Sequence, residues 1–218
     1  MSSNYEKLKA LIDVTQSNKE LECRDYLKYA KNLLFKESVI DFLYVETECR
    51  ARSGDSDYVI SGTTKDESGV ECNKLYVWEL KAPQCYIFEK DTENRLRPSI
   101  DLIKAENQLL NYHYELKGND SIRKDFGVYH PDDVLLGGII IGCDRTRVRG
   151  VIEEPKRSIA YQKATNLRKV LYRWGDIRLM TWDTVLIHIA PVEKPSASQA
   201  TRVTQTPRLP ANAQVDGL

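Results

Sequence analysis

The run from Val134 to Gly142 constrains the fold more than any other stretch of this sequence. Its residues, Val-Leu-Leu-Gly-Gly-Ile-Ile-Ile-Gly, include no polar side chain. A continuous apolar run of this kind is typical of a strand that is buried on both faces. Helices must then cover the sheet on each side, and 218 residues are enough for one such core. We therefore expect an α/β fold around a mixed sheet.

The other elements are predicted from hydrophobic periodicity and from capping residues. A helix is expected over Asn4–Asp13 and a second one after Ser17-Asn18, while Val39 to Glu46 fits either a strand or a helix continuation. The later elements, in chain order, are a strand at Asp57–Ser61, a strand at Lys74–Lys81, a helix from Pro98-Ser99 to Gly118, a helix at Ser158–Trp174, a strand at Ile177–Trp182 and a short helix capped by Asp183.

The amphipathic pattern also predicts which side chains of these helices face the core. In the helix that ends at Gly118, the expected apolar contacts are Ile100, Ile103, Leu109 and Leu110. In the helix at Ser158–Trp174, the expected inward residues are Ile159, Leu167, Val170, Leu171 and Trp174, and the outward ones are Lys163, Arg168, Lys169 and Arg173.

Composition bounds the domain organisation and the kinds of partner. Residues 1–190 are expected to form one folded domain. From Pro191 to Leu218 the chain has almost no large apolar side chains, so this tail is expected to be disordered. The formal net charge is zero, so a nucleic-acid site has to come from a local cluster of Lys and Arg rather than from global attraction.

Cysteine usage and hydropathy indicate the compartment. The five cysteines are widely spaced and never form Cys-x-x-Cys, which favours free thiols over disulfides or a zinc site. No apolar run approaches the length of a membrane span, and the first residues lack a hydrophobic signal core. A cytoplasmic protein without a membrane partner is expected.

Two carboxylates are predicted to meet at one end of the sheet. Asp57 opens one strand and Glu79 lies near the end of the next, so pairing of these strands as a hairpin would bring them together. Carboxylate oxygens are the ligands that Mg²⁺ prefers, and Mn²⁺ is the alternative ion. Lys81 follows Glu79 on the same strand face, where it could activate the attacking water or stabilise developing phosphorane charge. A helix acid, Glu22 or Glu20, could reach the same metal-bound water.

The set Asp57…Glu79-Leu80-Lys81 resembles the Asp…Glu-x-Lys core of the PD-(D/E)XK nuclease superfamily. More specifically, Glu79-Leu80-Lys81-Ala82-Pro83 followed by Ala105-Glu106-Asn107-Gln108-Leu109-Leu110-Asn111-Tyr112 resembles the Shedu nuclease family, which acts in bacterial defence against phage. The resemblance extends over roughly Lys19 to Ile189. It implies a restriction-endonuclease-like core, a mixed β-sheet flanked by helices.

The resemblance also implies roles for single residues. Asp57 and Glu79 would be metal ligands and Lys81 the catalytic lysine, while Gln108 and Tyr112 would line the substrate side of a helix. Glu22 would be the acid of the first helix, with Glu20 as its rival. The sequence departs from the pattern at Ser56, where a proline would precede the aspartate, and Asp55 competes for that role.

The sequence thus predicts a metal-dependent DNA endonuclease that forms a homo-oligomer. Basic residues for phosphate contact are expected at Arg145, Arg147 and Arg149, directly after the buried strand. The alternative function is a catalytically degenerate member of the same fold that binds nucleic acid or a protein partner without cleaving.

Overall fold

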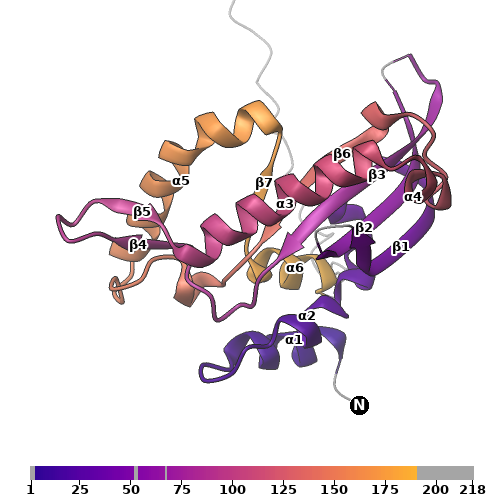
Figure 1. The fold of residues 1–218 in the computed structure, drawn as a ribbon. Coiled ribbons are helices and arrows are strands. Elements are labelled where there is room, and N and C mark those ends of the chain that lie inside the picture. The colour runs from indigo at the N-terminus through magenta and orange to yellow at the C-terminus, as the bar shows by residue number, and fades with distance from the viewer. Residues whose placement is uncertain (1–2, 52–53, 67, 191–218) are drawn as a thin grey trace, which may run out of the picture.

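The chain folds around one mixed sheet flanked by helices, as expected from its sequence (Figure 1). The computed structural model describes residues 3–51, 54–66 and 68–190. Within these ranges, it describes the side chains of all residues except 46–57. The first three strands of the sheet pair antiparallel; the fourth pairs parallel with the third, and the fifth pairs parallel with the fourth. In spatial order the strands are β1 (Val39–Ala51), β2 (Gly54–Lys65), β3 (Glu71–Leu80), β6 (Val134–Ile140) and β7 (Arg178–Met180). Residues 39–46, which the sequence left undecided, are therefore strand.

Helices cover both faces of this sheet. One face carries α3 (Ile100–Gly118) and α5 (Lys156–Gly175), and the other carries α1 (Asn4–Asp13), α2 (Glu20–Arg24) and α6 (Trp182–Ile189). The remaining elements are α4 (Asp120–Asp125), a hairpin of β4 (Phe88–Lys90) and β5 (Leu96–Pro98), and the 3₁₀ turns η1 (Leu27–Tyr29), η2 (Lys31–Leu34), η3 (Pro131–Asp133) and η4 (Asp144–Thr146). The described elements run from Asn4 to Ile189, and the tail from Pro191, expected to be disordered, lies outside the described residues.

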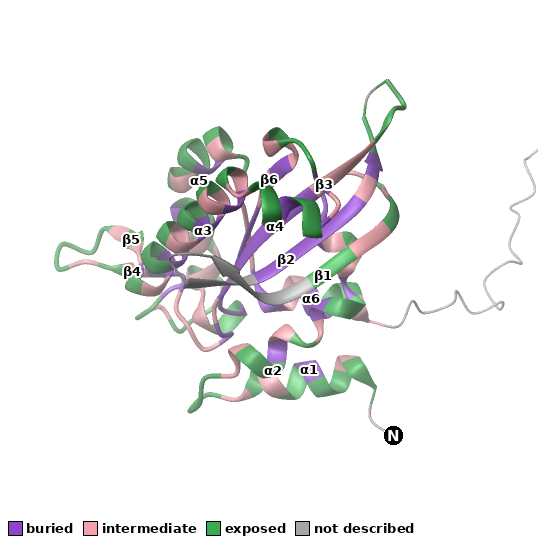
Figure 2. Cartoon of the chain, turned by 45° about the vertical axis from the view of Figure 1, so that its right-hand side comes forward, coloured by how far each residue is buried: buried purple, intermediate pink, exposed green. Residues whose placement is uncertain are grey.

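Alternation along β3 divides its side chains between two cores. Leu75 and Val77 are fully buried on the side of α3, and Tyr76, Trp78 and Leu80 are fully buried on the side of α1 and α6. Figure 2 shows this burial along the central strands. Each such side chain contributes about 1.5–3 kcal/mol through burial. A strand with two apolar faces must lie in the middle of the sheet, which fixes β3 between β2 and β6.

Two glycines allow β6 to approach β3 closely. The pairing shifts between Val77 and Trp78, so that Trp78 pairs with Gly138 and Gly137 becomes the extra residue. A Cβ atom at Gly137 would overlap the indole ring of Trp78. Gly138 has a φ of 154° and lies against the carbonyl oxygen of Arg178. The large side chain of β3 thus occupies the space that these glycines leave empty.

The helix α3 begins and ends where the sequence predicts. The Ser99 hydroxyl accepts a hydrogen bond from the Leu102 amide at 3.1 Å, which satisfies one free N–H of the first turn. Its buried stripe consists of Leu102, Ala105, Leu109, Tyr112 and Leu116. Of the four expected core contacts only Leu109 is buried; Ile100, Ile103 and Leu110 are exposed.

The predicted orientation of α5 is wrong. Ile159, Leu167, Val170, Leu171 and Trp174 were expected inside, yet all are exposed, and Trp174 is 88% exposed. The inward side instead carries Ala164 and Tyr172, whose hydroxyl donates to Glu106 of α3 at 2.7 Å. Arg168, expected outside, forms an ion pair with the same carboxylate at 2.6 Å. Hydrogen bonds to one acidic residue of α3 therefore orient the helix, in place of its large apolar side chains.

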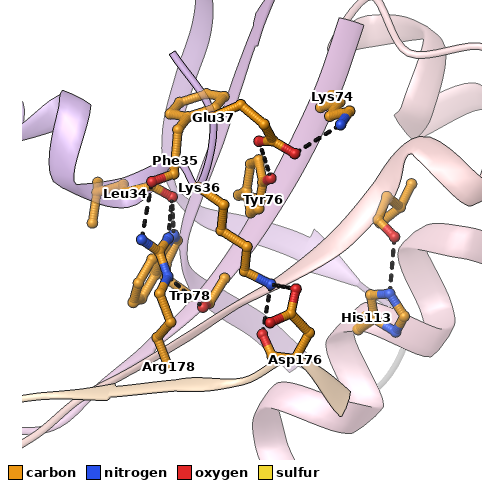
Figure 3. A network of polar contacts seen from close by, with 12 residues as sticks. Leu34, Phe35, Lys36, Glu37, Lys74, Tyr76, Trp78, His113, Asp176 and Arg178 are labelled. Carbon is orange, nitrogen blue, oxygen red and sulfur yellow. Dashed lines mark hydrogen bonds and ion pairs between the residues drawn. The ribbon is translucent and has the colours of Figure 1, made fainter. Parts of the chain in front are cut away.

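A polar network ties the segment after η2 to the sheet (Figure 3). Glu37 accepts hydrogen bonds from Lys74 at 2.8 Å and from the hydroxyl of Tyr76 at 2.5 Å. Lys36 contacts the carboxylate of Asp176, the residue that ends α5 in a left-handed conformation. These contacts fix the entry into β1 relative to β3 and β7.

Candidate functional site

The candidate site lies where β3 ends. Glu79 shares a strand face with Leu75 and Val77, so its carboxylate lies on the α3 side of the sheet, and it is fully buried. The amine of Lys81 lies 2.5 Å from Oε1 of Glu79. Burial makes an isolated carboxylate costly, so an ammonium group at this distance stabilises its ionised form. The predicted juxtaposition of Glu79 and Lys81 is present.

The backbone of Lys81 is held from two sides. Its amide donates to the carbonyl of Ile140 at 2.8 Å, and its own carbonyl accepts from Nε1 of Trp182 at 2.7 Å. Because β6 and α6 both anchor this residue, the amine projects from a rigid position. Rigid support of this kind is what a catalytic group requires.

The strand register places the position of Asp57 opposite Glu79. Tyr58 pairs with Trp78 in the antiparallel hairpin, and one step further along both strands lie Asp57 and Glu79. Asp55 instead lies across from Arg50 in the neighbouring pair of strands. The side chains of Asp55 and Asp57 lie outside the described ones, so this statement concerns their backbone positions. Of the two rivals, the register favours Asp57.

Between the two helix acids, the geometry favours Glu20. Its carboxylate accepts a hydrogen bond from the amide of Ala82 at 3.1 Å, which places it beside the end of β3. Glu22, the residue that the resemblance implies, points away from the strand end. Its carboxylate is 2.7 Å from Lys19, and the side chain lines a surface hollow between α1 and α2. The ion pair with Lys19 also lowers the pKa of Glu22.

Gln108 and Tyr112 lie one turn apart on α3. The amide of Gln108 donates to the hydroxyl of Tyr112 at 3.4 Å, and Gln108 is partly exposed. Tyr112 is only 6% exposed and belongs to the core between α3 and the sheet. The ring is therefore positioned as a core residue with a polar end, and not as a surface for stacking bases.

The three arginines after β6 differ in what they contact. They were expected to contact phosphates directly after the buried strand, where the chain forms the 3₁₀ turn η4. Arg145 donates to the carbonyl of Ile12 at 2.5 Å and so links this turn to α1. Arg147 pairs with Asp144 at 2.6 Å and lies 4.9 Å from the ring centre of Tyr161. Both guanidinium groups are engaged within the protein.

Arg149, like Arg145, is exposed, but within the described part of the chain its guanidinium contacts only other side chains. Its guanidinium carbon lies 4.8 Å from the ring centre of Tyr86, and its Nε is 3.8 Å from Glu89. The side chain remains 55% exposed. It therefore presents an accessible positive charge for a phosphate or a base.

Two further acidic residues lie in this region. One of them, Asp183, was expected to cap the last helix, but the cap position of α6 is occupied by Thr181 and Asp183 lies in the first turn. Asp183 accepts a hydrogen bond from the amide of Asp144 at 2.7 Å, and burial together with the charge of Asp144 raises its pKa. Asp101 lies in the first turn of α3, close enough to Cys85 to raise the pKa of that thiol. The larger cause is burial, and together they bring this pKa to about 11. An acid in a first helical turn is common for stability, so its sequence position gave no signal of a site.

The donors around the strand end are oxygen atoms, which suit a hard cation such as Mg²⁺ or Mn²⁺. Glu79 supplies one buried carboxylate, and the register places a second acidic residue opposite it. Among the described side chains, no group of three or more His, Cys, Asp or Glu is arranged to hold a metal ion. The side chain of Asp57, which the resemblance implies as the second ligand beside Glu79, is not among them.

Comparison with known proteins gives no family for the chain. A scan against protein-family models matches none, and a search of curated proteins finds no match. Within the described part of the chain, no helix is long and apolar enough to span a membrane.

Proposed function

We propose that the chain is a metal-dependent endonuclease that hydrolyses DNA phosphodiester bonds, with a restriction-endonuclease-like core of the PD-(D/E)XK type. One observation carries the proposal: the buried Glu79–Lys81 pair ends a central strand, directly across the hairpin from the position of Asp57. The arrangement of helix, hairpin, strand, α3 and parallel β6 around it agrees with the resemblance stated above. A role in phage defence, similar to that of the Shedu family, rests on that resemblance alone.

In this proposal each group has a distinct chemical task. Glu79 and Asp57 would hold Mg²⁺, which polarises the scissile phosphate and lowers the pKa of a bound water. Lys81 would place its ammonium group beside the phosphorus during attack, where negative charge develops on the phosphate oxygens. The anchored backbone of Lys81 keeps that amine in place, and the partly exposed Gln108 would contact the substrate.

Incubation of supercoiled plasmid with the protein and Mg²⁺ or Mn²⁺ tests this function. Wild type should nick or linearise the plasmid, and Lys81→Ala should lower the rate by about 100-fold or more. Lys74→Ala is the matched control, because Lys74 lies on β3, the strand that Lys81 directly follows, is also partly buried and pairs with Glu37 at 2.8 Å. Circular dichroism first establishes that both variants are folded. Lys74→Ala should then cleave the plasmid at the wild-type rate.

A second candidate is a nucleic-acid-binding protein that does not cleave. The observation that favours it is the direct contact of the Lys81 amine with Oε1 of Glu79, since this ion pair competes with a metal for the same oxygen. Calorimetric titration with Mn²⁺ separates the two functions. Binding of Mn²⁺ by wild type that disappears in Glu79→Gln supports the nuclease. A wild-type protein that binds DNA but neither binds Mn²⁺ nor cleaves the plasmid supports the binding protein.

A further inference from the structure

A hollow of about 260 Å³ opens beside the end of β3. It begins immediately after Lys81, because Ala82, Gln84 and Cys85 form part of its wall. Of its lining residues, only Arg149 has been given a role above, as a contact for a phosphate or a base. Its other lining residues are Thr15, Gln16, Ser17, Asn18, Tyr86, Asp101 and Arg149.

The walls of this hollow are held together without a ligand. The side-chain amide of Gln84 donates to the carbonyls of Leu11 and Val14, at 3.2 and 2.8 Å, and its oxygen accepts from the amide of Lys19 at 3.2 Å. Both ends of the loop 15–18 are therefore attached to the segment that follows Lys81. A pocket whose walls are fixed in this way does not need a partner in order to form.

One wall is a flat cationic platform. The guanidinium of Arg149 lies 4.8 Å from the ring centre of Tyr86, and the Arg149 amide donates to the carbonyl of Phe88 at 2.8 Å. Tyr86 covers one side of the guanidinium, while more than half of the Arg149 side chain stays exposed. Proteins that bind single-stranded nucleic acid stack unpaired bases on such planes.

The opposite charge also lines the hollow. Asp101 lines it, and the charges of Asp101 and Glu20 both act on the Cys85 thiol, which is itself part of the wall. These carboxylates repel a phosphate, whereas a carboxylate oxygen accepts hydrogen bonds from the amino group of a base. The charge pattern thus favours a neutral base inside, with its phosphate near Arg149.

We propose that this hollow receives an unpaired nucleobase of the DNA strand bound at Glu79 and Lys81. The base stacks on Arg149 and directs an amino group toward Asp101. This inference rests on the proposed function, and it adds a substrate class: DNA with a single-stranded gap, a flap or an extruded base next to the cut.

Binding to gapped duplexes in EDTA, where the DNA stays intact, tests the proposal. One duplex carries a single adenine in the gap, and the other carries an abasic residue there. Stacking of one base is worth about 1–3 kcal/mol, so wild type should bind the adenine gap about fivefold to 150-fold more tightly. In Arg149→Lys, which keeps the charge but loses the plane, the two affinities should become equal.

Arg97→Lys is the matched control. Arg97 also pairs with Glu89, at 2.8 Å, and is 60% exposed, but it lies outside the hollow. This variant should keep the wild-type preference, and Asp101→Asn should reduce it. If wild type binds both gapped duplexes with equal affinity and still cleaves plasmid, the proposal that the hollow receives a base is wrong and the proposed function stands. Absence of both cleavage and DNA binding would overturn the proposed function as well.

Discussion

The guanidinium of Arg178 lies 4.6 Å from the ring centre of Trp78 (Figure 3). Arg178 belongs to β7 and Trp78 to β3, and β6 lies between these two strands in the sheet. The same group donates to the carbonyls of Leu33, Leu34 and Phe35 at 2.9, 2.7 and 2.9 Å. One cation thus joins the end of η2 to the sheet and satisfies backbone acceptors that η2 leaves free.

Arg178→Lys should lower the free energy of unfolding by about 2–4 kcal/mol, because a lysine amine cannot stack on the indole and reach three carbonyls together. Urea denaturation followed by circular dichroism measures this change. Arg173→Lys, on the exposed side of α5, should stay within about 0.5 kcal/mol of wild type. Equal losses in both variants would contradict the anchoring role.

His113 should make the fold less stable in mild acid. Burial lowers its pKa, and its Nε2 lies 3.0 Å from the carbonyl of Val134, which requires the nitrogen to carry a proton as a donor. Because the folded pKa lies below the unfolded one, the unfolded chain binds the extra proton first as pH falls below about 6.5. The free energy of unfolding should therefore fall from pH 7.5 to 5.5, and His113→Gln should show a smaller fall. A larger fall in the variant would refute the assignment.

Glu20 and Glu22 should differ in their effect on cleavage. Glu20→Gln weakens the acceptor of the Ala82 amide next to Lys81, so the cleavage rate should drop about tenfold. Glu22→Gln alters an exposed ion pair with Lys19 and should leave the rate unchanged. Plasmid assays on both variants provide the measurement, and the reverse order of effects would restore Glu22 as the helix acid.

The exposed side of α5 predicts an unusual tolerance. Trp174→Ser removes a side chain that is 88% exposed and should change the free energy of unfolding by less than about 0.5 kcal/mol. Tyr172→Phe, two residues earlier, removes the hydrogen bond to Glu106 and should cost about 1 kcal/mol. A loss above about 2 kcal/mol for Trp174→Ser, measured in urea, would mean that this helix packs in the opposite orientation.

Local patterns were sufficient for the inner strands of the sheet and for one helix, but not for β1, which they left undecided. The apolar run from Val134 correctly indicated a central strand, and Ser99 and Gly118 marked the ends of α3. The hairpin of β2 and β3 was predicted from alternation and turn residues, and its register agrees with the expected meeting of positions 57 and 79. These features depend on residues that are close in sequence or on one strand pair.

Features that depend on distant contacts were missed. The orientation of α5 is fixed by Glu106 on another helix, which the periodicity of α5 alone does not contain. Likewise, Arg145 donates to the carbonyl of Ile12, more than a hundred residues away. Because the sequence around Arg145 does not contain this contact, Arg145 was predicted to bind phosphate. The hollow beside Lys81 combines four separate segments, and Gln84, which joins two of them, looked like a loop residue.

The indole ring of Trp78 fills the space that a side chain at position 137 would need. Homologous sequences should therefore show size covariation here: a smaller residue at position 78 permits a side chain at position 137, whereas tryptophan demands glycine. Position 138 should not take part in this exchange, since its backbone conformation and the Arg178 carbonyl require glycine whatever occupies position 78.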